Sequence, residues 1–181
     1  MLSILTLNKP NITDFALERN NLLKNAKTDW VLFLDSDEKL SKPITNISNK
    51  CDGYILKRKN YFLGKYVGDD FLVRLGKKKF TTWKRAVHEI WDIKNTCKLD
   101  NHIIHNTADN LADYLNKINN YSTLHAKANL KENKKSSIFK IIFFPIGKFV
   151  VTLIKSRHIV FSIMQSLHSY LSWTKLYFLQ S

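Results

Sequence analysis

An apolar run that ends in carboxylates constrains the fold of this chain more than any other feature. Residues 30–34 read WVLFL, and Asp35, Ser36, Asp37 and Glu38 follow directly. A run rich in Val, Phe and Trp predicts a strand buried on both faces, as in a parallel sheet. Ligands bind at the carboxyl ends of strands in open α/β sheets, so we expect Asp35 and Asp37 to converge there on one hard cation and its phosphate ligands. The alternative is that Asp35 caps a helix and that the other carboxylates are solvated.

A helix is expected immediately before this strand. Thr13 and Asp14 are candidates for its N-cap, and apolar side chains recur on one side of the segment as far as Lys27. The pair Thr28-Asp29 then turns the chain into the strand. A helix, a tight turn and a buried strand form half of a βαβ unit, so the fold class that we expect is α/β.

These two elements resemble a known family. Residues 15–20 (FALERN) and 26–38 (AKTDWVLFLDSDE) are similar to the signature of family 2 glycosyltransferases, in the bacterial branch that builds lipopolysaccharide core and other surface glycans. Residues 86–89, and residues 105–106 with 114–122, agree with the same pattern. The resemblance extends over about residues 13–130. It implies a partial GT-A-like, Rossmann-like mixed sheet with flanking helices.

The resemblance also assigns roles to individual residues. Asp35 and Asp37 would hold Mn²⁺ or Mg²⁺ on the diphosphate of a nucleotide-sugar donor, and Arg19 would lie near the nucleotide. Glu89 would be the base that takes the proton of the acceptor hydroxyl, and His88 would either bind the metal or orient Glu89. A metal that neutralises a leaving diphosphate and a carboxylate that accepts a proton suit this reaction.

Two of these residues also have simpler interpretations. Arg19 could be an exposed helical arginine that pairs with Glu18 or Asp14. His88-Glu89, taken as a bare dipeptide, is typical of a surface turn or of the end of a strand.

The amino-terminal segment departs from the family pattern. The family places two further parallel strands, with an aspartate-rich turn that holds the nucleotide, ahead of the FAxxRN helix. Here residues 1–12 precede it, and only residues 3–7 predict a short strand. We therefore expect a truncated gene product, a shortened variant with weak donor binding, or one half of a site that a partner chain completes.

The middle of the chain predicts short strands. Residues 53–64 are typical of a strand or hairpin arm, and residues 71–75, with a turn at 76–79, predict a second hairpin that leads to 87–89. We expect this region to hold the glycan or glycolipid acceptor, but we favour a place in the core for most of its aromatic side chains over stacking on sugar faces. Residues 109–130 predict an amphipathic helix.

The two cysteines show no metal-ligand spacing. Cys51 and Cys97 are far apart in the sequence, and a reduced, cytosolic protein with two buried or idle thiols is the interpretation that we favour.

The composition changes at residue 133. From there to residue 181 there is no Asp or Glu, while seven Lys and Arg supply half of the formal net charge of +14. Neither residues 138–154 nor 159–174 form a clean span of roughly 20 apolar residues. We therefore divide the chain into a truncated GT-A-like domain, 1–132, and a basic, apolar, helical segment, 133–181. We expect this segment to lie on the cytoplasmic, anionic face of the cell membrane, with packing against the first domain as the alternative.

Two functions from different classes follow. The first is a membrane-associated, metal-dependent transferase that moves a sugar from a nucleotide-sugar donor to a lipid-linked or cell-surface glycan. The second is a non-catalytic remnant or accessory membrane-binding subunit. A nucleic-acid partner is not expected, because the positive charge accompanies aliphatic and aromatic runs that favour lipid.

Overall fold

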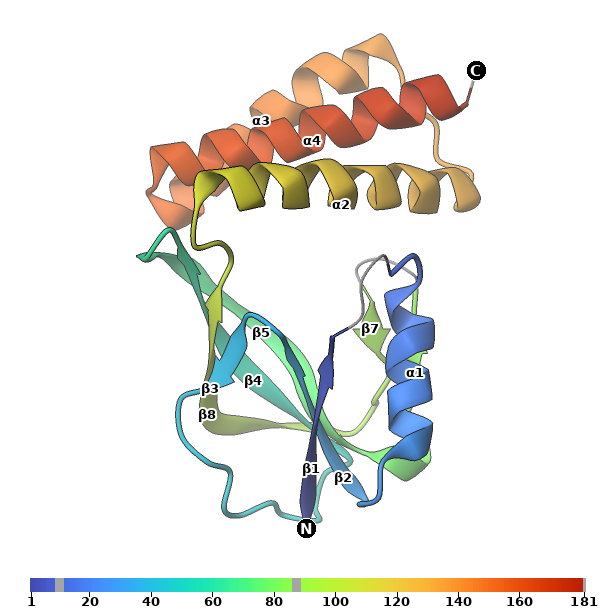
Figure 1. Ribbon diagram of the computed structural model, residues 1–181, viewed down its shortest axis with the longest axis vertical. Coiled ribbons are helices and arrows are strands. Elements are labelled where there is room, and N and C mark those ends of the chain that lie inside the picture. The colour runs from blue at the N-terminus through green and yellow to red at the C-terminus, as the bar shows by residue number, and fades with distance from the viewer. Residues whose placement is uncertain (9–11, 86–88, 181) are drawn as a thin grey trace. The chain divides into compact units, whose positions relative to one another are not determined.

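The computed structural model describes residues 1–8, 12–85 and 89–180 of the 181-residue chain. The fold is mixed α/β, and the described residues form a curled, mixed sheet of six strands and four α-helices (Figure 1). The chain divides into two compact units. Unit 1 contains Met1–Asn60 and Asp69–Asn106, and unit 2 contains Tyr61–Gly68 and Thr107–Ser181.

The sheet has the strand order β1-β2-β5-β4-β8-β3. Its strands are β1 (Leu2–Leu7), β2 (Trp30–Asp35), β3 (Glu38–Leu40), β4 (Gly53–Phe62), β5 (Lys65–Lys77) and β8 (Thr96–Asn106). A separate two-stranded sheet pairs β6 (Trp83–Lys84) with β7 (Ile90–Trp91), after a short 3₁₀ turn at Lys78–Phe80. Strands β1 and β2 pair in parallel, with Leu2 opposite Trp30 and Leu7 opposite Asp35. On its other side β2 pairs antiparallel with β5, and β3 pairs antiparallel with β8.

The predicted strand at residues 30–34 is confirmed as β2, and it is buried on both faces. On one face Leu32 packs in a core cluster with Leu75 of the adjacent strand β5 and Leu56 of β4, the next strand along. On the other face Phe33 packs with side chains of helix α1 (Phe15–Asn25) and of β6 and β7. Each face of β2 thus has its own apolar core, which explains the absence of any polar residue before Asp35.

Helix α1 is confirmed where the sequence predicts it. The Asp14 side chain caps it, because its carboxylate accepts a hydrogen bond of 2.9 Å from the backbone N–H of Leu17. The buried residues of α1 are Ala16, Arg19 and Leu23, so one charged side chain lies on the face that packs on the sheet.

One long hairpin replaces part of the predicted strand pattern. Strand β5 begins at Lys65 and continues to Lys77, so the expected break before residue 71 is absent. The hairpin turns at Leu63 and Gly64, which both have positive φ (47° and 75°), as a two-residue hairpin turn requires. Gly68, with a φ of 128°, sits inside β5 where an interruption was predicted.

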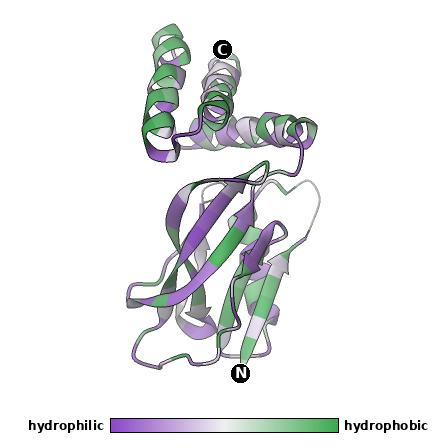
Figure 2. Cartoon of the chain, turned by 90° about the vertical axis from the view of Figure 1, so that its left-hand side faces the viewer, coloured by the Kyte–Doolittle hydropathy of each residue, from purple (hydrophilic) through white to green (hydrophobic). Residues whose placement is uncertain are grey.

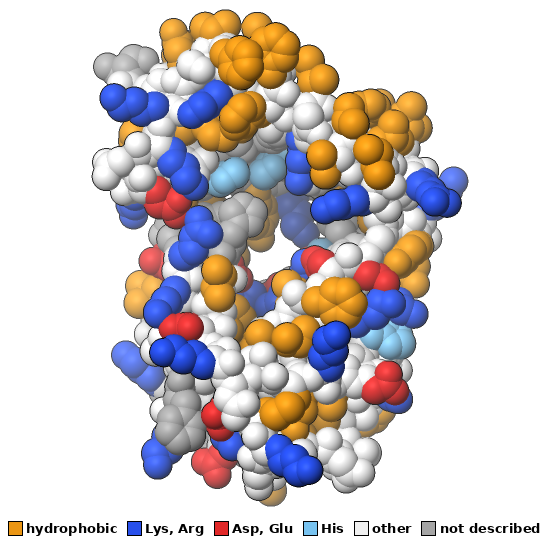
Figure 3. All heavy atoms as spheres, turned by 180° about the vertical axis from the view of Figure 1, so that it is seen from behind, with side chains coloured by type: hydrophobic (Ala, Val, Ile, Leu, Met, Phe, Trp, Pro, Cys, Tyr) orange, Lys and Arg blue, Asp and Glu red, His pale blue; other side chains and the backbone are white. Residues whose placement is uncertain are grey.

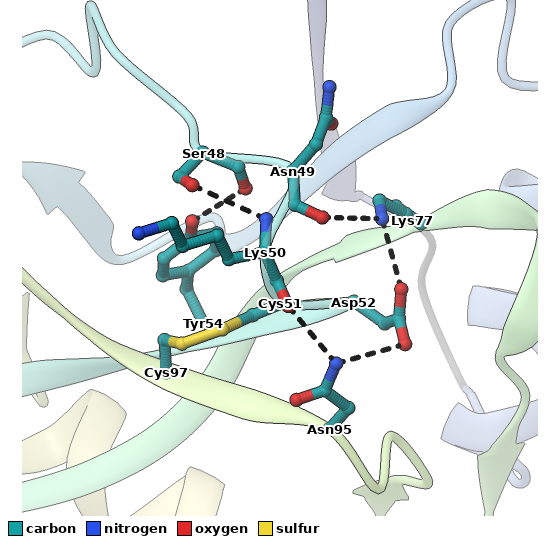
Figure 4. Close-up of a disulfide and its surroundings, with 9 residues drawn as sticks. All are labelled: Ser48, Asn49, Lys50, Cys51, Asp52, Tyr54, Lys77, Asn95 and Cys97. Carbon is teal, nitrogen blue, oxygen red and sulfur yellow. Dashed lines mark hydrogen bonds and ion pairs between the residues drawn. A yellow bond between two sulfur atoms is a disulfide. The ribbon is translucent and has the colours of Figure 1, made fainter.

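The prediction of two idle thiols is wrong, because Cys51 and Cys97 form a disulfide (Figure 4). Their Cα atoms are 5.9 Å apart. The same region is held by Tyr54, whose hydroxyl donates to the Ser48 carbonyl at 2.7 Å, and by the Lys77–Asp52 ion pair at 3.0 Å. The pairing joins the segment before β4 to β8, and it depends on a strand arrangement that cysteine spacing does not reveal.

Unit 2 is built from helices α2 (Leu111–Lys131), α3 (Ile138–Ser156) and α4 (Ile159–Leu179). Helix α2 confirms the predicted amphipathic helix. Helix α4 contacts both of the others: its Gln165 donates to the Tyr114 hydroxyl of α2 at 2.9 Å, and its Ser166 donates to the Pro145 carbonyl of α3 at 2.9 Å. Lys175 of α4 also donates to Asn119 of α2 at 2.7 Å.

In the part of the chain that the structure describes, no helix combines the length and the apolar content needed to cross a membrane.

Candidate functional site

The carboxylates nominated from the sequence lie at the carboxyl end of β2. Asp35 is the last residue of that strand, Ser36 and Asp37 form a turn, and Glu38 begins β3. The parallel partner β1 ends beside it, with Leu7 opposite Asp35. The carboxylates therefore lie at the carboxyl end of a strand, as the sequence predicts.

Arg19 brings two distant carboxylates to the same guanidinium. Its Nη2 donates to Asp35 Oδ1, and its Nε donates to Glu89 Oε1 at 3.0 Å. The residue is only 1% exposed, and its guanidinium lies 4.8 Å from the centre of the Trp83 ring. The alternative of an exposed helical arginine is therefore wrong.

Arg74 of β5 extends this network to Glu38. Its Nη2 donates to Asp35 Oδ2 at 2.8 Å and to Glu38 Oε1 at 3.0 Å. The Glu38 side chain is fully buried, and it also accepts from Arg58 at 2.8 Å and from the backbone N–H of Asp35 at 3.0 Å. Both side-chain oxygens of Asp35 thus accept from guanidinium groups.

Arg58 of β4 closes the network at its outer end. It makes two bonds to Asp70, of 3.0 Å and 2.7 Å, in addition to its bond to Glu38. We call the seven residues joined in this way the charged cluster: Arg19, Asp35, Glu38, Arg58, Asp70, Arg74 and Glu89.

The motif analysis did not identify Arg58, Arg74 or Glu38 as members of a site. The signal that could have found Arg74 is its position in the strand sequence FLVRL, because a charged side chain in an otherwise apolar strand needs a partner of opposite charge. The partner itself could not be read from the sequence, because Glu38 lies on another strand.

The cluster shifts the ionisation of its members. Burial alone would raise the pKa of Asp35, but the charges and hydrogen bonds of Arg74 and Arg19 outweigh burial and lower that pKa. Burial opposes the charged form of Arg19, yet Asp35 and Glu89 raise its pKa above the usual value. Asp35 and Arg19 are therefore held in their charged forms at neutral pH.

Two donors of the cluster have no partner within the protein residues that are described. They are Nη1 of Arg19 and Nη1 of Arg74, both buried. A buried N–H group without an acceptor is costly, and sites of this kind favour an anion or an ordered water. Both atoms belong to guanidinium groups that also bind Asp35, so their unused donors belong to the same cluster.

Asp37 has different neighbours from Asp35. Its Oδ2 lies 3.4 Å from Nε2 of His105, whose Nδ1 is 2.7 Å from Asn60 Oδ1. The backbone carbonyl of Asp37 accepts from the N–H of Asn106 at 3.0 Å. The two aspartates of the motif therefore bind different groups.

Mn²⁺ or Mg²⁺ at Asp35 and Asp37 stays a prediction. Carboxylate oxygens have the chemistry that these cations require, but both oxygens of Asp35 are bonded to arginine. Within residues 1–8, 12–85 and 89–180, no group of three or more His, Cys, Asp or Glu side chains is arranged to hold a metal. His88, the third expected ligand, lies outside the described residues. We therefore derive no chemical step through a metal.

No protein-family model matches this sequence, and no curated protein matches it at a significant level.

Proposed function

We propose that this chain is a glycosyltransferase of the family 2, GT-A type, which moves a sugar from a nucleotide-sugar donor to a lipid-linked or cell-surface glycan such as lipopolysaccharide. One observation carries the proposal: a single buried guanidinium, that of Arg19, binds both Asp35 and Glu89. These three residues come from a helix, a strand end and a distant segment. The resemblance gives them the nucleotide, diphosphate and proton-transfer roles of one reaction.

The position of the cluster also supports a donor site. Asp35 ends a strand that pairs in parallel with β1, and strand ends of this kind are where open α/β sheets bind nucleotides. The buried Nη1 groups of Arg19 and Arg74 supply N–H donors beside Asp35. Guanidinium groups suit phosphate oxygens because they neutralise charge and donate in a fixed planar geometry.

In the proposed reaction, the two carboxylates bound to Arg19 have different roles: Glu89 accepts a proton, and Asp35 lies at the donor diphosphate. The acceptor hydroxyl gives its proton to Glu89 while its oxygen forms a bond to the anomeric carbon of the donor. The bond between that carbon and the diphosphate oxygen breaks, and the nucleoside diphosphate leaves with the electron pair. Attack opposite the leaving group inverts the anomeric centre. Arg19 and Arg74 stabilise the charge that develops on the diphosphate.

A specific observation favours a second function. Both oxygens of Asp35 already bind arginines, as expected for an ion-pair network that only stabilises the fold. In that case the chain is a non-catalytic remnant or an accessory membrane-binding subunit. The two functions differ in whether the cluster binds nucleotide.

Calorimetry on the full chain separates them. A panel of nucleoside diphosphates is titrated with MnCl₂ or MgCl₂ present. We expect one member to bind, and we expect Asp37→Ala to weaken binding about tenfold or more, as is usual when a group that holds or orients a metal is lost. Asp100→Ala is the matched control, because the Asp100 side chain is fully exposed and pairs only loosely with Lys42, at 3.8 Å.

Glu89→Gln tests the proton-transfer role. The variant should bind the same nucleotide within a few-fold and lose roughly a hundredfold or more of its transfer rate, because a positioned base contributes that much. Release of nucleoside diphosphate from the nucleotide sugar measures the rate. If no nucleoside diphosphate binds the wild-type chain, the transferase proposal is wrong. Transfer by Glu89→Gln at the wild-type rate would rule out Glu89 as the base.

A further inference from the structure

Helix α3 exposes an apolar surface that nothing in the described chain covers. At about 100° per residue, nine apolar residues occupy consecutive positions that span roughly 160° around the helix, and Ser156, the last helical residue, shares the position of Ile138. The nine are, in order around the helix, Ile138, Phe149, Ile142, Leu153, Ile146, Phe139, Val150, Phe143 and Ile154, which we call the α3 outer face. Seven of the nine are between 47% and 72% exposed, and Phe149 and Leu153 are partly buried. Figure 2 shows α3 coloured as hydrophobic over most of its length.

The opposite side of α3 is already occupied by α4. Pro145 and Thr152 of α3 are buried, and Ser166 of α4 donates to the Pro145 carbonyl at 2.9 Å. Phe144 packs edge-on against Trp173 of α4, with ring centres 4.9 Å apart. One side of α3 thus packs against α4, and the outer face remains exposed on the folded unit.

The charge around this face is of one sign. At about 100° per residue, Lys140 lies roughly 40° beyond the edge of the outer face at Ile154, whereas Lys148 and Lys155 project from the other side of the helix, and no acidic residue occurs from 133 to 181. Lys140 is held there by a bond of its ammonium to the Lys135 carbonyl at 2.6 Å. Figure 3 shows hydrophobic side chains gathered over the helices with Lys and Arg beside them.

We propose that the α3 outer face inserts into the headgroup region of an anionic bilayer, with α3 lying in the plane of the membrane. Contiguous apolar surface of this kind is rare on soluble monomers. An apolar face on a segment whose charged side chains are all basic fits acyl chains and anionic headgroups, and the Lys140 stem at the edge of the face can extend its ammonium group to the phosphates. An apolar protein groove would match the face but not the uniformly positive charge of residues 133–181. This inference does not depend on sugar transfer.

Co-sedimentation of the full chain with vesicles tests the apolar part. The vesicles are phosphatidylcholine alone or mixed with phosphatidylglycerol. We expect strong binding only to the mixed vesicles, and Phe139→Ser should weaken it about tenfold through lost apolar burial. Phe71→Ser is the matched control, because Phe139 and Phe71 are each 62% exposed and Phe71 lies on β5. The control should bind as the wild type does.

A pair of charge variants tests the role of Lys140. Lys140→Gln should weaken binding by roughly fivefold, whereas Lys98→Gln, at an exposed position of unit 1, should not. Added salt should weaken wild-type binding. Equal binding to both vesicle types, or equal losses in Phe139→Ser and Phe71→Ser, overturns the proposal. The proposal is also wrong if light scattering shows that the wild-type chain is a dimer, that Phe139→Ser dissociates this dimer, and that the dimer does not bind vesicles.

Discussion

Replacing Arg74 with methionine tests the charged cluster most directly. The substitution keeps an unbranched apolar stem of similar length and removes a buried guanidinium that bonds to Asp35 and Glu38 at 2.8 Å and 3.0 Å. Breaking a buried ion pair from one side costs about 3–5 kcal/mol, because the remaining charge is left without compensation.

The contacts that remain in the structure put the expected cost of Arg74→Met near the lower end of that range. Glu38 keeps its 2.8 Å bond from Arg58 and its 3.0 Å bond from the backbone N–H of Asp35. Asp35 keeps its bond from Arg19. Each carboxylate therefore retains one guanidinium, and we expect a loss of about 3 kcal/mol in the free energy of unfolding. For a chain of this size that corresponds to a melting temperature lower by roughly 6–12 °C.

The loss should depend on pH. In the wild type the pKa of Asp35 is lowered, so the unfolded state binds its proton more tightly than the folded state does. The ionised carboxylate therefore stabilises the fold above its unfolded pKa of about 3.9, and this stability disappears as pH falls through the lower folded value. Without Arg74, burial opposes ionisation more strongly and the folded pKa rises. The difference between wild type and Arg74→Met should be largest at neutral pH and should disappear as the pH falls below about 4, through the lowered pKa of Asp35.

Urea unfolding followed by tryptophan fluorescence at neutral and acidic pH measures this difference. Trp30, Trp83 and Trp91 are buried in unit 1 and report on its unfolding. Lys57→Met is the control, because it removes an ion pair to Asp69 whose lysine is 43% exposed, and such pairs contribute about 1 kcal/mol or less. A loss below about 1 kcal/mol for Arg74→Met, or a loss that is the same at both pH values, would refute the electrostatic explanation.

Two further perturbations have expected outcomes. Cys97→Ser should lower the free energy of unfolding by about 2–4 kcal/mol, because the disulfide closes a loop with a sequence separation of 46. In urea titrations, reductant should lower the free energy of unfolding of the wild type to the value of the variant. If reductant also destabilises the variant, this explanation is wrong. Removing residues 136–181 should unfold or aggregate α2, since Tyr114, Ile118 and Ala126 of that helix are buried in a unit shared with α4. Dye binding to exposed apolar surface and circular dichroism measure the outcome, and a truncated protein with intact α2 and no dye binding would show that α4 is dispensable.

The elements that the sequence predicts well are those whose local pattern and tertiary role agree. Residues 30–34 form a buried strand because every side chain is apolar and both faces of β2 carry a core. Helix α1 begins after Asp14 because that side chain caps the Leu17 N–H. In both cases the cause lies within a few residues, which is why inspection of the sequence finds it.

Long-range pairing accounts for what the sequence analysis missed. Strand β5 contains Gly68, Asp69 and Asp70, which locally indicate a loop, yet pairing within the sheet keeps this segment extended. Asp70 is further held by Arg58 of β4 through two hydrogen bonds. Tertiary contacts override local preference here, as is common in strands.

In the candidate site, too, the sequence identifies some residues and misses those placed by long-range pairing. The sequence nominated Arg19, Asp35 and Glu89 through a family resemblance, and the structure joins these three. Neither Arg74 nor Glu38 was nominated, because each owes its place to a strand that arrives from elsewhere in the chain. Motif spacing therefore found the residues at one end of the network, Glu89, Arg19 and Asp35, and missed those at its centre and its other end.

The formal charge of the cluster bears on what it can bind. Four carboxylates, those of Asp35, Glu38, Asp70 and Glu89, stand against the three guanidinium groups of Arg19, Arg58 and Arg74, which leaves a formal charge of −1. A bare diphosphate would add negative charge to a site that is already negative, in surroundings where burial strengthens repulsion. Diphosphate binding by the cluster therefore requires an accompanying cation. If the cluster is a donor site, the protein should bind nucleotide in the presence of Mn²⁺ or Mg²⁺ and should release it when the cation is chelated. If the cluster only stabilises the fold, the protein should unfold at the same urea concentration whether or not cation and nucleotide are present.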